Sequence, residues 1–168
     1  MKRLWAPWRM SYILGEDEQA QQRCIFCVRD HTDDEDLLIL YRSHQSYVIM
    51  NKYPYTNGHL MIAPYRHTSD ITELSPDEVL DMHQLTVMAR DVLIRCCAPQ
   101  GFNFGMNMGK IAGAGVADHL HQHLVPRWSG DTNFMPVFAD VRVIPQHLEE
   151  TYWMLRREFQ QAAARKSE

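Results

Sequence analysis

The sequence has no long hydrophobic run and no excess of positive charge. No apolar stretch approaches the roughly 20 residues that cross a membrane, and Met1–Arg9 lacks the apolar core of a secretion signal. With 17 Lys and Arg against 21 Asp and Glu, the formal net charge is −4, which argues against general nucleic-acid binding. We therefore expect a cytoplasmic protein with no membrane or nucleic-acid partner, whose four cysteines are normally reduced.

Three histidines that alternate along one stretch are the most informative feature of the chain. Residues two apart in a β-strand point to the same face, so the stretch 119–125 is predicted to be a strand with His119, His121 and His123 on one face. Unpaired imidazoles are poor core residues, and therefore the pattern indicates a function. The middle imidazole could attack phosphorus while a neighbour contacts phosphate, or two or three of the rings could hold a metal.

A loop of small residues, Lys110–Asp118, leads directly into the histidines. It is not a P-loop, because it does not end in Gly-Lys-Ser or Gly-Lys-Thr. The backbone N–H groups of such a loop can nevertheless approach phosphate oxygens. Its position before the histidines indicates a phosphate site, with the N–H groups of Gly113, Ala114, Gly115 and Val116 as candidate donors.

A pair of cysteines, Cys24 and Cys27, has the spacing of two zinc ligands, but a four-ligand site needs two more. Thioredoxin-like redox chemistry would require a helix after the pair, and the stretch 28–34 does not have a helical pattern. A third interpretation is that the two cysteines are ordinary buried residues without a function. Cys96 and Cys97 are adjacent near the end of a predicted helix, and we expect them to be free thiols.

Short apolar or alternating stretches predict strands over 37–41, 46–51, 58–63 and 101–109, in addition to 119–125. A helix is predicted to begin after Ser75, a good N-cap that is followed by proline and two acids. A final helix is predicted over 145–164. Together these elements predict an α+β fold, an antiparallel sheet of about five strands with two main helices.

The domain organisation expected from this pattern is one domain over residues 1–168. Residues 1–23 would form an N-terminal arm that packs on the body or a partner subunit, or covers the substrate. Residues 24–128 would form the catalytic core. Residues 129–168 would form a C-terminal loop and helix.

The pattern His-x-His-x-His followed by two apolar residues resembles the signature of the histidine-triad superfamily of nucleotide hydrolases and transferases. The segment 51–64 resembles its Asn-x-x-Pro-x-x-x-Gly-His strand pair, and the segment 101–109 resembles its phosphate-side strand. The opening segment 4–13 is similar to bacterial members of the fragile-histidine-triad and diadenosine tetraphosphate phosphorylase branch. The resemblance implies a HIT-like fold and a homodimer with a continuous sheet.

The same resemblance implies cleavage of dinucleoside polyphosphates, such as diadenosine tetraphosphate, at the α-phosphate. It places a nucleotidyl-phosphohistidine intermediate on His121, with water or phosphate as the acceptor. His119 and His123 would complete the catalytic set, with His123 contacting phosphate, and Asn51 and Asn107 would contact ribose or phosphate. A nucleoside phosphoramidase, a nucleotide-binding sensor with little turnover, and a zinc hydrolase that uses the three triad histidines as ligands remain alternatives.

A zinc site is also implied by resemblance. His67 resembles a zinc histidine of the related hexose-1-phosphate uridylyltransferases, in which a further ligand matches the first triad histidine. Zinc held by Cys24, Cys27, His67 and His119 would be a closed structural site that anchors the N-terminal segment and orients the catalytic strand. Gln122 occupies a position that is usually apolar in the family, so we expect its face of the strand to be partly exposed.

Overall fold

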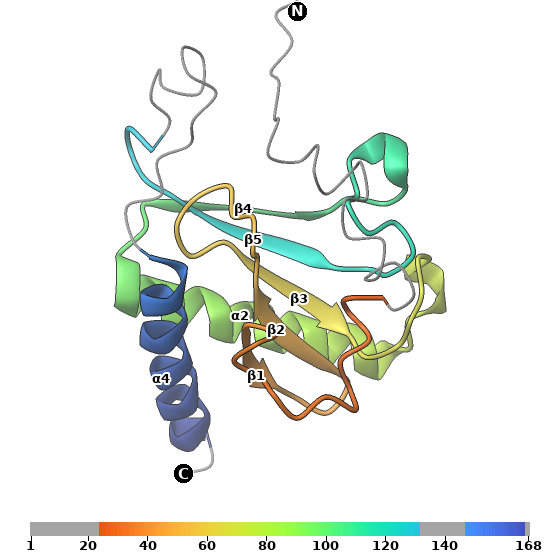
Figure 1. Cartoon of the computed structure of the whole chain (residues 1–168), viewed down its shortest axis with the longest axis horizontal. Coiled ribbons are helices and arrows are strands. Elements are labelled where there is room, and N and C mark those ends of the chain that lie inside the picture. Colours follow the sequence, from red (N-terminus) through yellow and green to blue (C-terminus); the bar gives the residue numbers. More distant parts are fainter. Residues whose placement is uncertain (1–23, 132–146, 167–168) are drawn as a thin grey trace, which may run out of the picture.

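The computed structural model describes residues 24–131 and 147–166, which form one antiparallel sheet with two main helices (Figure 1). The strand order is β1-β2-β3-β5-β4, and every neighbouring pair is antiparallel. This confirms the predicted α+β class. The predicted N-terminal arm, residues 1–23, lies outside the described residues. The strands are β1 (Ile39–Arg42), β2 (Ser46–Met50), β3 (Leu60–Pro64), β4 (Gly101–Met106) and β5 (Gln122–Arg127).

The long helix α2 (Pro76–Cys97) begins as the sequence predicts. The Ser75 side chain accepts a hydrogen bond from the N–H of Glu78, and the Glu78 carboxylate accepts one from the N–H of Ser75. This capping box satisfies two backbone donors that a helix start leaves without partners. Two short 3-10 helices are also described, η2 (Ile71–Glu73) and η3 (Lys110–Ala112). In the described part of the chain, no helix is long and apolar enough to span a membrane.

The main core lies between one face of the sheet and the two helices. Figure 1 shows α2 running across this face and α4 (Leu148–Lys166) standing at its side. Apolar residues recur along α4 at intervals of three and four positions and so form one face of the helix. On this face Tyr152, Leu155 and Phe159 are buried against α2 and β1, as predicted. Apolar side chains of α2 fill the space above the strands; the buried ones are Met82, Leu85, Met88, Ala89, Val92 and Leu93.

The opposite face of β1, β2 and β3 is covered by the segment that starts at Cys24. Phe26 is buried in a second apolar cluster on this face, and the Tyr47 hydroxyl donates to the Phe26 carbonyl at 2.8 Å. Every residue of β2 and β3 is therefore buried, which confirms that the sheet is covered on both faces there. This second cluster comprises Phe26, Val28, Ile39, Tyr47, Ile49, Met61 and Ala63.

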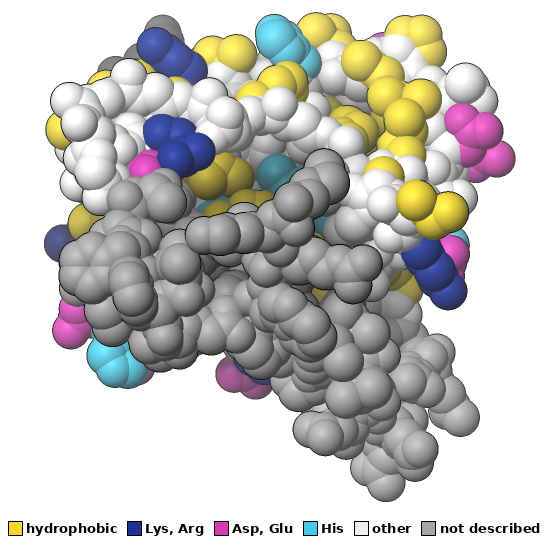
Figure 2. All heavy atoms as spheres, turned by 90° about the horizontal axis from the view of Figure 1, so that it is seen from above, with side chains coloured by type: hydrophobic (Ala, Val, Ile, Leu, Met, Phe, Trp, Pro, Cys, Tyr) yellow, Lys and Arg dark blue, Asp and Glu magenta, His cyan; other side chains and the backbone are white. Residues whose placement is uncertain are grey.

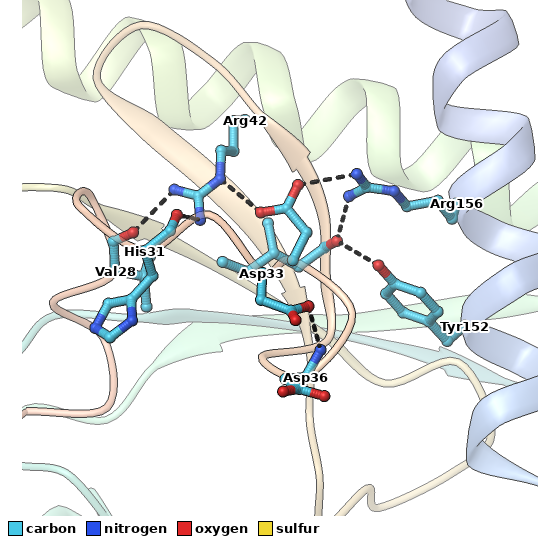
Figure 3. Close-up of polar contacts among 9 residues, drawn as sticks. Val28, His31, Asp33, Asp36, Arg42, Tyr152 and Arg156 are labelled. Carbon is cyan, nitrogen blue, oxygen red and sulfur yellow. Dashed lines mark hydrogen bonds and ion pairs between the residues drawn. The ribbon is translucent and has the colours of Figure 1, made fainter.

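A network of charged groups fixes the loop that follows the cysteine pair (Figure 3). The Arg42 guanidinium donates to the carbonyls of Val28 and His31 at 3.0 Å each. The Asp34 carboxylate accepts from Arg42 at 2.7 Å and from Arg156 of α4 at 2.9 Å. Because one carboxylate joins β1 to α4, the loop carrying the cysteines is tied to the main body of the fold.

Strand β5 begins later than the sequence predicts. The ladder with β3 pairs Ile62 with Gln122 and stops there, so His119 and His121 precede the strand. The groups that would extend the ladder have other partners. The N–H of Leu120 donates to the Thr68 carbonyl at 2.7 Å, and the ring of His119 bonds to the carbonyl of Pro64 at 2.9 Å.

Gln122 corrects a second expectation, because its face of the strand is covered rather than partly exposed. The side chain is buried, and its Nε2 donates to the hydroxyl of Thr86 on α2 at 2.6 Å. One hydrogen bond to the helix thus takes the place of the apolar contact expected there, since a buried amide needs a partner.

Candidate active site and metal centre

His121 lies at the centre of the site, with one ring nitrogen engaged and the other available. Its Nδ1 is 2.9 Å from the carbonyl oxygen of His119, and a carbonyl can only accept, so Nδ1 carries the proton. Nε2 makes no hydrogen bond to any described residue and has the lone pair of a nucleophile. Burial lowers the pKa of His121, which favours the neutral form, although the hydrogen bond to His119 opposes the shift.

His123 is paired with a fourth histidine, His59. The Nε2 of His59 lies 2.9 Å from the Nδ1 of His123. The N–H of Tyr55 donates to the Nδ1 of His59 at 3.1 Å, so that nitrogen carries no proton. Neutral His59 must therefore donate from Nε2 to His123, which leaves the proton of neutral His123 on its own Nε2. His123 is in this way prepared to donate a hydrogen bond.

Asn51 supports His59 from behind. Its Oδ1 accepts from the N–H of Tyr53 at 2.9 Å, which fixes the orientation of the amide and turns Nδ2 toward the Nδ1 of His59, 3.3 Å away. The family resemblance implied that Asn51 contacts ribose or phosphate, which remains a prediction. It assigned no role to His59. The signal for His59 was its place in the Gly-His pair of the family-like segment.

The triad rings are close together but face different partners. The centroids of His121 and His123 are 5.0 Å apart in an edge-to-face arrangement, whereas His119 turns toward the cysteines. His119 and His121 are buried, and His123 is half-buried. Figure 2 shows histidine atoms (cyan) recessed in a hollow of the surface seen from above. Part of the histidine surface is thus open to a ligand.

Cys24, Cys27, His67 and His119 come together in one cluster, although sequence places them up to 95 residues apart. Their ligand atoms all lie within 4.8 Å of one another. The Sγ atoms lie 3.3 to 3.9 Å from imidazole Nδ1 atoms of His67 and His119. A tetrahedral zinc ion would separate neighbouring sulfur and nitrogen ligands by about 3.6 Å. The donor set and its spacing therefore fit zinc.

The tautomer of His119 also suits a metal ligand. Its Nε2 donates to the Pro64 carbonyl at 2.9 Å, so Nδ1 presents a lone pair to the thiols. Burial raises the pKa of the Cys27 thiol and Cys24 raises it further, a cost that a bound divalent cation would offset. Both ring nitrogens of His119 are thus engaged inside the protein, and among the described residues the Cys2His2 set is the only ligand cluster. The three triad histidines do not form one.

The predicted phosphate loop divides into two parts. The N–H of Gly113 donates to the Lys110 carbonyl at 3.0 Å, and the N–H of Ala114 donates to the Gly109 carbonyl at 3.4 Å. The N–H groups of Gly115 and Val116 have no hydrogen bond to a described residue and are the donors left for a ligand. Asn107 follows β4 and is half-buried, with its Nδ2 3.5 Å from the Gly113 carbonyl.

Known proteins resemble this chain over most of its length. The HIT domain family matches residues 33–130. The AP-4-A phosphorylase of Mycobacterium tuberculosis is 37% identical over 165 residues, which are 95% of this chain and 85% of that protein. The bis(5'-nucleosyl)-tetraphosphatase [asymmetrical] of Schizosaccharomyces pombe is 28% identical over 93 residues, which are 55% of this chain and 50% of that protein.

A solved structure extends the similarity to the fold. It is a Zn-bound histidine triad family protein from Mycobacterium smegmatis, which is 28% identical and superposes with a TM-score of 0.65 over 84% of this chain and 96% of that one. The matched range 33–130 contains His59, His67 and all three triad histidines, whereas the cysteine pair precedes it.

Proposed function

This chain belongs to the HIT domain family, and we propose that it cleaves dinucleoside polyphosphates such as diadenosine tetraphosphate at the α-phosphate. The observation that carries the proposal is the imidazole of His121, which is buried, hydrogen-bonded through Nδ1 and available at Nε2. A neutral imidazole held in this way is a nucleophile directed at one point in space. Relatives named as an AP-4-A phosphorylase and a bis(5'-nucleosyl)-tetraphosphatase support this substrate class.

In the first step, the Nε2 of His121 attacks the α-phosphorus in line. The phosphorus–oxygen bond to the rest of the polyphosphate breaks, and with diadenosine tetraphosphate ATP leaves while an adenylyl group stays on His121. The ring gains positive charge, which its Nδ1–H shares with the carbonyl of His119. The proton of His123 Nε2, set by His59, stabilises charge on the phosphate oxygens or on the leaving group.

Other donors for the phosphate are the N–H groups of Gly115 and Val116 and the amide of Asn107. They come from the loop directly before the triad and from the end of the neighbouring strand β4. Backbone donors fixed before the substrate arrives need no reorganisation as charge develops. His119 serves as a support, because both of its ring nitrogens are already engaged.

In the second step, an acceptor attacks the adenylyl-histidine and releases His121 unchanged. Inorganic phosphate is the acceptor we infer, which converts diadenosine tetraphosphate and phosphate into ATP and ADP. The relative that covers 95% of this chain is named a phosphorylase, whereas the hydrolase relative matches 55%. Water as the acceptor would give AMP in place of ADP.

Zinc at Cys24, Cys27, His67 and His119 is proposed as a structural cofactor. Four protein ligands close the coordination sphere, so the ion would contribute no open position for substrate or water. These residues would instead hold the segment before β1 against the end of β3. A Zn-bound relative in the same fold supports the assignment.

A homodimer and a cytoplasmic location complete the proposal. Strand β4 is at the edge of the sheet, with one described strand as neighbour, and Phe104 on it is 59% exposed. Pairing of two copies along β4 would cover an open strand edge and give a continuous sheet. None of the four described cysteines is in a disulfide, which is consistent with a reducing compartment.

Product analysis tests the proposed reaction. The protein is incubated with diadenosine tetraphosphate with and without inorganic phosphate, and the products are separated by chromatography. We expect multiple turnovers only when phosphate is present, with ADP and ATP formed in equal amounts. AMP and ATP regardless of phosphate would overturn the acceptor assignment. Cleavage of adenosine phosphoramidate without cleavage of the polyphosphate would overturn the substrate class.

A further inference from the structure

Phe26 connects the cysteine pair to the candidate nucleophile. It lies between Cys24 and Cys27 in sequence, and its ring stacks on the ring of His121 with centroids 4.6 Å apart and an interplanar angle of 21°. The same ring lies 5.4 Å from that of His119. Phe26 is 1% exposed, so this contact is part of the packed interior.

The position of Phe26 is itself closely fixed. Its carbonyl accepts hydrogen bonds from the buried Tyr47 hydroxyl at 2.8 Å and from the N–H of Val28 at 3.0 Å. The turn is closed by the N–H of Cys27, which donates to the Cys24 carbonyl at 3.0 Å. Arg42 holds the next part of the loop through the Val28 carbonyl (Figure 3). A side chain on so fixed a turn can serve as a rigid support.

The ring of His121 needs such a support. One hydrogen bond, from Nδ1 to the His119 carbonyl, fixes the distance of the ring but still allows rotation about that bond. Rotation would swing Nε2 away from the line of attack on phosphorus. The flat face of Phe26 removes this freedom, because a stacked ring pair resists tilting.

We propose that Phe26 is a positioning residue for His121 and that it transmits the state of the Cys2His2 cluster to the nucleophile. Both supports of His121 originate in that cluster: His119 provides the carbonyl, and Phe26 sits between the two cysteines. Loss of the cluster therefore releases the ring of His121 from both sides at once. The inference rests on the proposed function for its kinetic part, but not for its structural part.

The kinetic test compares Phe26→Leu with Ile25→Ala. Ile25 is the neighbouring residue of the same turn and is 52% exposed, which makes it a matched control. We expect Phe26→Leu to lower kcat by about 10²-fold with KM changed less than about twofold, because the nucleophile is misdirected while substrate contacts stay. Zinc content should stay at one ion per chain, and Ile25→Ala should match the wild type. Phe26→Met, which fills similar volume with a flexible chain, is made in parallel in case the leucine variant does not fold.

A second test uses NMR spectroscopy and does not depend on enzymatic turnover. In the wild type, ¹⁵N NMR of the imidazoles should show His121 with its proton on Nδ1 alone. In Phe26→Leu we expect signals of both His121 tautomers in exchange, with the tautomers of the remaining histidines unchanged. If the wild type has no activity but the His121 signal changes as described, the proposed function fails and the positioning role stands. An unchanged His121 signal and an unchanged kcat would overturn the positioning role.

The coupling to the cluster is tested by combining Phe26→Leu with Cys27→Ser. If Phe26 transmits the state of the cluster, the two losses in kcat are not independent, and the double variant should be little worse than Cys27→Ser alone. The His121 signal of Cys27→Ser should resemble that of Phe26→Leu. Multiplication of the two losses in the double variant would show that the cluster and Phe26 act separately, and would overturn the coupling.

Discussion

The Nε2 atom of His59 donates a hydrogen bond to the Nδ1 atom of His123 across 2.9 Å. His59 is held in the required tautomer by the N–H of Tyr55, so replacing it removes the group that keeps a proton on the outer nitrogen of His123. We expect His59→Ala to lower kcat by about 10²-fold, a loss typical of proton donors in catalysis. The matched control is His83→Ala, at an exposed position of α2, which should retain full activity. Full activity of the His59 variant would contradict the donor role of His123.

The proposed zinc site predicts that the metal content of the protein, measured by mass spectrometry, depends on Cys27. Wild-type protein should carry about one zinc ion per chain, and Cys27→Ser should carry almost none and melt at a lower temperature, since metal binding contributes directly to folding. Cys96→Ser changes a half-buried thiol outside the cluster and should keep its zinc. Equal zinc content in the two variants would show that the cluster is not the metal site.

The buried contact between Gln122 and Thr86 predicts a change in stability that depends on which partner is removed. Gln122→Leu leaves the Thr86 hydroxyl without its donor at 2.6 Å, and we expect the free energy of unfolding in urea to fall by about 1–3 kcal/mol. The double variant Gln122→Leu with Thr86→Val removes both polar groups and should recover most of this loss. A double variant less stable than the single one would mean that the site requires a polar pair for another reason.

The N-terminal turn of α2 predicts a dependence of stability on pH. Burial alone would raise the pKa of Glu78, but hydrogen bonds from Arg66 and Ser75 outweigh it and hold the pKa below its usual range. A carboxyl whose pKa is lowered by folding stabilises the protein above its unfolded pKa of about 4.3, and this contribution is lost as the pH falls through the lower folded pKa.

We therefore expect Glu78→Gln to lower the melting temperature near neutral pH by about 2–4 °C, as a loss of about 1 kcal/mol would. The difference should shrink as the pH falls below about 4, where the wild-type carboxyl also becomes neutral. Glu35→Gln, at an exposed position, is the control and should have little effect at either pH. A difference that stays constant between neutral and acid pH would rule out the ionised carboxylate as its cause.

The elements of the fold follow from local patterns in the sequence. Ser75 and Pro76 mark the start of α2, and the spacing of Tyr152, Leu155 and Phe159 places one face of α4 in the core. Both could be predicted because a helix cap and the spacing of apolar residues are recognised within a few consecutive residues. The start of β5 could not be read in this way. The partners that end the ladder, Thr68 and Pro64, lie on a distant segment.

The candidate site likewise contains features that local sequence patterns predict and others that depend on contacts between distant segments. Alternation of the histidines predicted a functional role for His121 and His123, which remains a prediction. Family resemblance grouped His67 with the cysteine pair, and the geometry of the cluster supports this grouping. The roles of His59 and Phe26 depend on ring contacts across the sheet, which no local pattern encodes. Likewise, which N–H groups of the loop remain open depends on how its turn closes.

Capture of the covalent intermediate tests the central claim most directly. The protein is mixed with diadenosine tetraphosphate without phosphate and quenched under conditions that preserve phosphohistidine, and its intact mass is measured together with that of the His121→Ala variant. We predict a mass increase of one adenylyl group, mapped by peptide analysis to His121 and absent from the variant, whose fold and melting temperature should stay close to wild type. An adenylyl group on another residue, or turnover by His121→Ala, would contradict the account.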